Sequence, residues 1–206
     1  IHRAVTGPSF EKSFLEVKKD TNLQARFYVS ASGSSGTLAA GDYLKDHLNT
    51  KIAVVEATEC PTLLYNGYGE HNIQGIGDKH VPLIHNVMNT DFVVGVSDQA
   101  TNNLNLIFNT EIGQNYLKSK KGLKDVFVER LPEFGLSSIA NIIASIKLAK
   151  YMNLGPEDAI ITVATDGAEL YLTELEKTKK EFHGIYDEIS CAEIYGQFLK
   201  GVTTDH

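Results

Sequence analysis

Cysteine is scarce in this sequence. The chain has two cysteines, Cys60 and Cys191, which lie far apart and form no CxxC pair. This pattern argues against the disulfide framework of small secreted proteins and indicates two free thiols in a reducing compartment. We therefore expect a cytoplasmic protein.

Basic residues and long apolar runs are also few. Lys and Arg number 19 against 26 Asp and Glu, a net charge of -7, which argues against a nucleic-acid partner. No apolar stretch approaches the roughly 18 residues of a membrane span, so we expect no membrane partner. The start, IHRAVTGPSF, lacks the charged and apolar regions of a signal peptide and an initiator Met. We expect a processed product or part of a longer protein.

Helical and strand-like patterns alternate along the chain. Of its 206 residues, 42% are hydrophobic and 22% are charged, which is ordinary for a soluble globular protein. Helical spacing occurs at residues 7–22, 37–48, 99–119 and 137–158, and strand-like runs occur at 25–32, 51–57, 91–98, 125–131 and 159–167. The alternation predicts an α/β fold of three layers, doubly wound, with a mostly parallel sheet of about five strands and helices on both faces.

The helix expected at 137–158 has recognisable ends. Ser137 or Ser138 can cap its start, and Gly155 with Pro156 can stop it. Residues 58–90 form instead a long irregular section rich in glycine and proline. Long loops within compact domains are usually functional or disordered.

The loop GSSGT joins the strand at 25–32 to the next helix, where ligands collect in such folds. Its small residues allow a close backbone approach, and glycine can adopt positive φ at little cost. The first amides of a helix are unpaired and favour an anion. The loop therefore suggests a phosphate cradle, although an empty turn explains it equally well. It matches neither GxxxxGK[ST] nor GxGxxG. The residues of this loop are Gly33, Ser34, Ser35, Gly36 and Thr37.

Two further segments carry polar groups at suggestive places. HNIQGIGDKHVP crowds His71, Asp78 and His80 together, but the spacing fits no zinc motif, and solvated loop histidines are the favoured interpretation. The strand at 159–167 ends in Thr165 and Asp166, which could bind a ligand edge or simply form a turn and a helix cap.

Read in order, seven segments resemble the cysteine synthase and cystathionine β-synthase group of pyridoxal-phosphate enzymes. That group has the tryptophan-synthase β-type fold, also called fold type II. The matching segments run over residues 1–173, and their order and spacing make the resemblance specific. They are TGPSFEKS, SGSSGTLAAGDYLK, VVEATECPTLL, HNIQGIGDKHVP, FVVGVSDQAT, GLSSIANIIASIKLAK and TDGAELYLTE.

The resemblance implies pyridoxal 5'-phosphate as the cofactor. The family's G-x-G-G-T loop binds its phosphate, which carries over to Gly33, Ser34, Gly36 and Thr37, with Ser35 in place of a glycine. The QGIG segment of the family lines the cofactor and substrate cleft. That role carries over to Gly75, Ile76 and Gly77.

The resemblance also implies a hydroxyl partner for the pyridine nitrogen. The family's P-D-S-G pattern reads Thr165-Asp166-Gly167-Ala168 here, so the usual Ser is a glycine. We favour Thr165 as the partner. Asp166 in that place would instead keep the nitrogen protonated and make a stronger electron sink.

One stretch departs from ordinary cysteine synthases. Asp78, Lys79 and His80 occupy positions that are small and apolar in that group. These substrate-cleft candidates suggest a polar or larger amino acid rather than O-acetylserine.

The family's Schiff-base lysine and its substrate-carboxylate loop lie upstream of the matching segments. Lys79 is the only lysine of this chain in a glycine-rich loop, and a solvated side chain is the favoured interpretation there. We expect the catalytic lysine to lie outside this chain and the chain alone to be inactive.

The resemblance implies a lyase or transferase of amino-acid metabolism, and the chain would be its C-terminal, cofactor-binding portion. The full protein would catalyse β-elimination or β-replacement on a small amino acid. Two alternatives stay open: a non-catalytic α/β module that binds a phosphorylated small molecule or a partner subunit, and a nucleotide-binding domain.

We expect two regions and self-association. Residues 1–173 would form the pyridoxal-phosphate-binding α/β portion, and residues 174–206 a polar, helical C-terminal extension. Missing early residues would leave a strand edge exposed, so a homodimer or larger homo-oligomer is expected.

Overall fold

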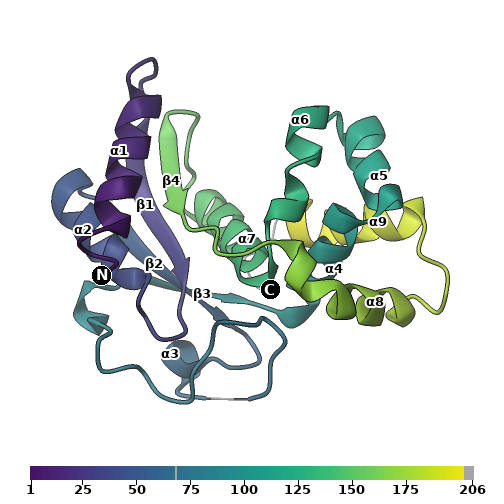
Figure 1. Cartoon of the computed structure of the whole chain (residues 1–206), viewed down its shortest axis with the longest axis horizontal. Helices are drawn as coiled ribbons and strands as arrows, with labels where there is room; N and C mark the ends of the chain where they lie inside the picture. Colours follow the sequence, from purple (N-terminus) through teal and green to yellow (C-terminus); the bar gives the residue numbers. More distant parts are fainter. Residues whose placement is uncertain (68, 202–206) are drawn as a thin grey trace.

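The computed structural model describes residues 1–67 and 69–201, which form a parallel sheet covered on both faces (Figure 1). Within these residues the sheet has 4 strands in the order β3-β2-β1-β4, and each neighbouring pair is parallel. The α/β fold class is therefore confirmed. The strands are β1 (Gln24–Ala31), β2 (Lys51–Ala57), β3 (Phe92–Val96) and β4 (Asp158–Thr162).

The central strands are apolar on both faces because helices cover both. In β1, Phe27 and Val29 belong to the larger core cluster, whereas Tyr28 between them packs with Ala40 and Leu44 of helix α2 (Leu38–Leu48). Alternate residues of a strand point to opposite faces. A strand with two apolar faces must therefore lie between two layers.

One layer consists of α2 and α1 (Thr6–Lys18), and the other is built around α7 (Leu136–Tyr151), which contacts all four strands. Figure 1 shows the first pair on the left of the sheet and α7, with the helices that pack around it, on the right. The remaining helices are α3 (Thr62–Tyr65), α4 (Asp98–Asn109), α5 (Glu111–Lys121), α6 (Asp125–Val128), α8 (Leu172–Glu181), α9 (Glu188–Ile194), the 3-10 turns η1 (Val87–Asn89), η2 (Leu131–Glu133) and η3 (Ala168–Tyr171), and the π-helix η4 (Tyr195–Lys200).

The strand order places a switch point between β1 and β4. From β1 the chain crosses through α2 to β2 on one side, and it later returns on the other side as β4, with Val29 beside Thr162. In open α/β sheets, ligands bind outside the carboxyl ends of the strands at such a point.

The strand predicted at residues 125–131 is wrong. That segment forms α6 and leads into η2, and it lies away from the sheet. Val126 and Phe127 are exposed there, whereas Val128 is buried. β-propensity mainly reports fit to a half-buried pleated surface, and this segment has no neighbouring strand to provide one.

Three boundaries also differ from expectation. The helix predicted at 99–119 is two helices, α4 and α5, separated by Thr110. Ser137 and Ser138 lie inside α7, which starts after Gly135, so neither caps it. The same helix ends at Tyr151, before the predicted stop at Gly155 and Pro156.

The C-terminal helices pack onto the main core. Helices α8 and α9 contact α4, and Cys191, Ile194 and Phe198 belong to the larger core cluster. Both cysteines are free and buried. Among the helices of residues 1–67 and 69–201, none could span a lipid bilayer. The last part of the predicted extension, 202–206, lies outside the described residues.

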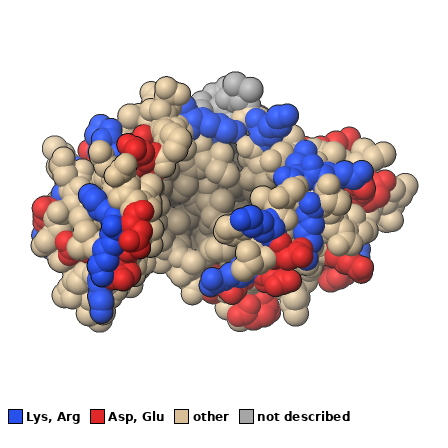
Figure 2. Space-filling model, turned by 90° about the horizontal axis from the view of Figure 1, so that it is seen from above, with Lys and Arg blue, Asp and Glu red and all other residues tan. Residues whose placement is uncertain are grey.

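The surface seen from above is hollowed in the middle. Figure 2 shows charged side chains on both flanks of this hollow, whose floor is formed by uncharged residues. The molecule therefore presents an uncharged concave face between the α1–α2 side and the side that carries α5.

The break between α4 and α5 yields a first prediction. The Thr110 hydroxyl accepts a 3.1 Å hydrogen bond from the Gly113 amide, which is the N-cap interaction of α5, and it donates to the carbonyl of Leu106. Thr110→Ala should lower the free energy of unfolding by about 1–2 kcal/mol, because the cap is lost. Urea unfolding followed by circular dichroism measures this free energy. Thr110→Ser, which keeps the oxygen, should lose less than half as much, and equal losses would contradict the capping role.

Candidate functional site

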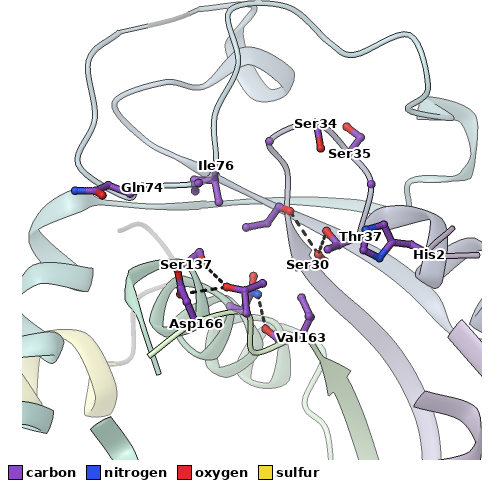
Figure 3. Close-up of a pocket in the computed structure, with 16 residues that line it drawn as sticks. His2, Ser30, Ser34, Ser35, Thr37, Gln74, Ile76, Ser137, Val163 and Asp166 are labelled. Atoms are coloured by element: carbon purple, nitrogen blue, oxygen red, sulfur yellow. Dashed lines mark hydrogen bonds between the residues drawn. The ribbon is translucent and has the colours of Figure 1, made fainter. Parts of the chain in front are cut away.

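A cavity of about 240 Å³ lies at the switch point, beyond the carboxyl ends of β1 and β4. Figure 3 shows three segments around it: the loop with Ser34 and Ser35 above, Gln74 and Ile76 to one side, and Ser137 with Asp166 below. The described lining residues include no Lys or Arg. They are His2, Ser30, Ala31, Gly33, Ser34, Ser35, Gly36, Thr37, Gln74, Gly75, Ile76, Ser137, Asn141, Val163, Thr165 and Asp166.

The loop Gly33–Thr37 forms the first wall, and Ser35 is its conformational centre. Ser35 has a φ of 63° and is 3% exposed, and its hydroxyl lies 3.1 Å from that of Ser32. Gly33 and Gly36 could adopt positive φ at little cost, but neither does. The serine at the position where the family has a glycine thus adopts the backbone conformation that favours glycine.

The two glycines of this loop are required by close approach. A Cβ on Gly33 would lie 2.8 Å from the carbonyl oxygen of Gly75, and a Cβ on Gly36 would lie 3.1 Å from the His2 ring. A side chain at position 33 would force the Gly75 backbone outward, whereas one at position 36 would require only a small shift of the His2 ring. The glycines therefore set the distance between the loop and the rest of the cavity wall.

The amides of this loop are available to a ligand. Among the described residues, the backbone N–H groups of Ser34 to Leu38 donate no hydrogen bond, and helix α2 starts at Leu38. Such amides, together with the positive end of a helix dipole, favour an anion.

The Thr37 hydroxyl can donate its hydrogen to a ligand, because its oxygen already accepts a bond from the protein. Its oxygen accepts a 2.8 Å hydrogen bond from Ser30, and the Thr37 carbonyl accepts one of 2.9 Å from the Tyr28 hydroxyl. Burial raises the pKa of Tyr28 to about 12, so that hydroxyl keeps its proton. The Thr37 hydroxyl hydrogen remains available for an anion beside the free amides.

The second wall is the loop that contains Gly75 and Ile76. Its position is set by Asp98, the first residue of α4, whose carboxylate accepts hydrogen bonds of 2.6 Å and 3.1 Å from the amides of Asn72 and Ile73. Burial raises the pKa of Asp98 and opposes ionisation, whereas the two amide bonds favour it. Asp98 therefore holds Asn72 and Ile73, the two residues that directly precede the cavity-lining residue Gln74.

The third wall joins α7 to the segment after β4. Ser137 and Thr165 hydroxyls lie 3.0 Å apart, and the Thr165 hydroxyl donates to Asp166 over 3.2 Å. The other carboxylate oxygen of Asp166 accepts a 2.5 Å hydrogen bond from Tyr171. Burial and the Asp166 carboxylate raise the pKa of Tyr171, so Tyr171 stays a donor.

The structure separates the remaining predicted residues from this cavity. Gly77 donates its amide to the Ser32 carbonyl over 2.8 Å, and beyond that bond lies a second, smaller hollow lined by Asp78 and His80. Asp78 uses a carboxylate oxygen to accept from the His80 amide. Lys79 is exposed and lines neither space.

Sequence reasoning overlooked seven lining residues, of which Ala31 and Val163 belong to β1 and to the segment directly after β4. Ser137 and Asn141 lie four apart on α7, within the GLSSIAN segment that carried the resemblance, and this spacing places them on one helix face. His2 and Ser30 show no signal in the sequence, because only the fold brings them to the loop. Gln74 directly precedes Gly75.

The described residues contain no group of three or more His, Cys, Asp or Glu that could hold a metal ion. His71, which prompted the question, instead packs against Gly77.

Comparisons with known proteins agree with the resemblance. No protein-family model matches the chain. Cysteine synthase B of Campylobacter jejuni is 32% identical over 161 residues, which are 77% of this chain and 46% of that protein.

Solved structures agree as well. A cysteine synthase of Entamoeba histolytica aligns with 97% of this chain and 51% of its own, at 25% identity and a TM-score of 0.67. An O-acetylserine-dependent cystathionine β-synthase of Helicobacter pylori aligns with 74% of this chain and 43% of its own, at 26% identity and a TM-score of 0.53. The chain thus spans about half the length of these relatives. Its resemblance to the cysteine synthase group is confirmed.

The role of Asp98 gives a second prediction. Asp98→Ala removes the acceptor of two amides and should lower the free energy of unfolding by about 2 kcal/mol. Hydrogen exchange at the Asn72 and Ile73 amides should accelerate more than exchange in the sheet. Gln99→Ala, at the exposed neighbouring position of the same helix, is the matched control and should change neither quantity. Unchanged exchange at Asn72 and Ile73 in the Asp98 variant would show that the loop is held by other contacts.

Proposed function

We propose that this relative of the cysteine synthases is the C-terminal, cofactor-binding part of a pyridoxal-phosphate-dependent enzyme. The enzyme would be a lyase or transferase that acts on a small amino acid by β-elimination or β-replacement. One observation carries the proposal: three segments with the family's order meet around one cavity, and one of them offers free amides. Those segments contain Gly33–Thr37, Gly75 with Ile76, and Thr165 with Asp166.

The donor set of the cavity fits a phosphorylated ligand. The amides of Ser34 to Leu38 and the Thr37 hydroxyl can donate to phosphate oxygens, and the Gly33 and Gly36 backbones leave room that a Cβ would fill. The absence of Lys and Arg from the described lining means that the anion would be bound by dipoles rather than by a cationic side chain.

Each wall then has a separate task. The loop Gly33–Thr37 holds the phosphate, Gly75 and Ile76 limit the cavity from the side, and the hydrogen-bonded pair Thr165 and Asp166 closes it below. When bound, pyridoxal phosphate supplies an electron-withdrawing ring that stabilises negative charge on the substrate's α-carbon. Ile76, which is 7% exposed, and the buried end of β1 keep water from that ring.

The neighbouring hollow is the proposed place for part of the substrate. Asp78 and His80 line it together with Ser32 and Gly77, whose chain neighbours Gly33 and Ile76 line the main cavity. We propose that the substrate carries a polar group that these side chains can reach. The lysine that would bind the cofactor covalently belongs, in this proposal, to a part of the enzyme outside the chain.

A binding experiment tests the phosphate site. The chain should bind pyridoxal 5'-phosphate, and inorganic phosphate should compete. Gly33→Ala should weaken binding by about tenfold or more, because the new Cβ would lie 2.8 Å from the Gly75 carbonyl and displace that wall. The matched control is Gly196→Ala, where an added Cβ meets open space, and it should bind like the wild type.

The same mixture of the chain and pyridoxal 5'-phosphate tests whether the catalytic lysine lies outside this chain. After borohydride reduction and tryptic digestion, mass spectrometry should find no cofactor on Lys79 above the level of other exposed lysines. A stoichiometric adduct on Lys79 would contradict our placement of the catalytic lysine outside this chain.

We further propose that the chain self-associates. β3 and β4 are the edges of the sheet within the described residues, and Leu83, Ile84 and Met88 are exposed side chains of the segment before β3. Exposed strand edges and apolar patches favour association. Sedimentation velocity should show a dimer or a larger species, and a monodisperse monomer would contradict this.

A further inference from the structure

The side chain of Asn141 stands out in the cavity because one of its two polar atoms has no partner. Asn141 is 1% exposed and lines the cavity from α7. Its Nδ2 donates a 3.0 Å hydrogen bond to the Val163 carbonyl, whereas its Oδ1 is buried and has no hydrogen-bond partner among the described residues.

The orientation of this amide is determined by its neighbour. The Val163 carbonyl can only accept, so the amide nitrogen must face it, and the oxygen must point elsewhere. A buried carbonyl oxygen without a donor costs roughly 1–3 kcal/mol. A ligand donor that reached this oxygen from the cavity would remove that cost.

The other polar groups of this wall are already engaged. The Thr165 hydroxyl lies between the Ser137 hydroxyl and Asp166, and both carboxylate oxygens of Asp166 accept hydrogen bonds. Asn141 differs from them because its Oδ1, which like any amide oxygen can only accept, has no partner among the described residues. What it requires from a ligand is therefore an N–H or O–H group.

We propose that Asn141 is the hydrogen-bond acceptor for the protonated ring nitrogen of the bound pyridine ligand. The inference rests on the proposed function, because it assumes a pyridoxal-type ligand in this cavity. It replaces Thr165, which the resemblance favoured, with a residue on the facing helix. An acceptor that cannot donate favours the protonated over the neutral ring nitrogen, and so raises the pKa of that nitrogen.

The ligand for the test is pyridoxine 5'-phosphate, which has no aldehyde and cannot react with lysines. Its partner is the analogue in which a ring C–H replaces the ring nitrogen. Calorimetry of the wild-type chain should give about tenfold tighter binding of the nitrogen-containing ligand, the difference expected for one hydrogen bond to a charged group. Asn141→Ala should bind both ligands equally.

Two control variants assign the effect to the Asn141 side chain. Ser145→Ala removes a hydroxyl that donates to the Asn141 backbone carbonyl and leaves the side chain intact, so it should keep the tenfold preference. Thr165→Val should lower both affinities together or neither, and should keep their ratio. If Asn141→Ala does not fold, the wild-type preference and its survival in Thr165→Val still decide the question.

A spectroscopic readout separates ligand contact from a structural role. The absorption of the bound pyridine ring reports the protonation of its nitrogen. In the wild type that proton should be lost at a higher pH than in free ligand, and in Asn141→Ala at the pH of free ligand. A merely structural defect would weaken binding without moving that pH.

The outcomes are distinguishable. Equal affinity of the wild type for the two ligands, or loss of the preference in Thr165→Val alone, overturns the assignment to Asn141 and leaves the phosphate site standing. A wild-type chain that binds neither pyridoxine phosphate nor inorganic phosphate overturns the proposed function and this inference together.

Discussion

The site depends on one pairing, the parallel contact between β1 and β4. These strands lie far apart in the sequence, but their register places Val29 beside Thr162, so the segments that follow them leave the sheet side by side. One segment becomes the loop Gly33–Thr37 and the other carries Thr165 and Asp166. Without this pairing the two walls of the cavity would not face each other. The apolar layers on both faces of the sheet stabilise it, since each strand buries two sides.

Close approach and unsatisfied backbone groups then shape the cavity. Gly33 lets the loop approach the Gly75 carbonyl, and Ser35 takes the one positive-φ conformation in the loop. The free amides between Ser34 and Leu38 make an anion site in a chain whose net charge is negative. Backbone dipoles act at hydrogen-bond range, so the local site does not depend on the sign of the overall charge.

Most of the fold could be predicted from pattern, and the failures have identifiable causes. The runs that became β1, β2 and β3 are apolar or aromatic and β-branched, which fits a sheet buried on both faces. The run at 125–131 has similar residues but no neighbouring strand, and it became α6. Thr110 looked like one more polar residue in a long helix, yet its hydroxyl caps α5. For the run at 125–131 the missing partner is a neighbouring strand, whereas for Thr110 the deciding contact is the local bond from the Gly113 amide.

For the candidate site, the order of residues along the chain predicts which segments carry small and hydroxyl residues at strand ends, and it indicated the family. Which of these segments meet depends on how the strands pair and pack. The tertiary structure brought His2, Ser30 and Asn141 to the cavity, and it left Asp78 and His80 in an adjoining hollow. It also showed that Thr165 and Asp166 bind each other, whereas the Asn141 oxygen has no partner among the described residues. The reason is physical: a residue's type is local, but whether its polar atoms are satisfied depends on neighbours that only folding supplies.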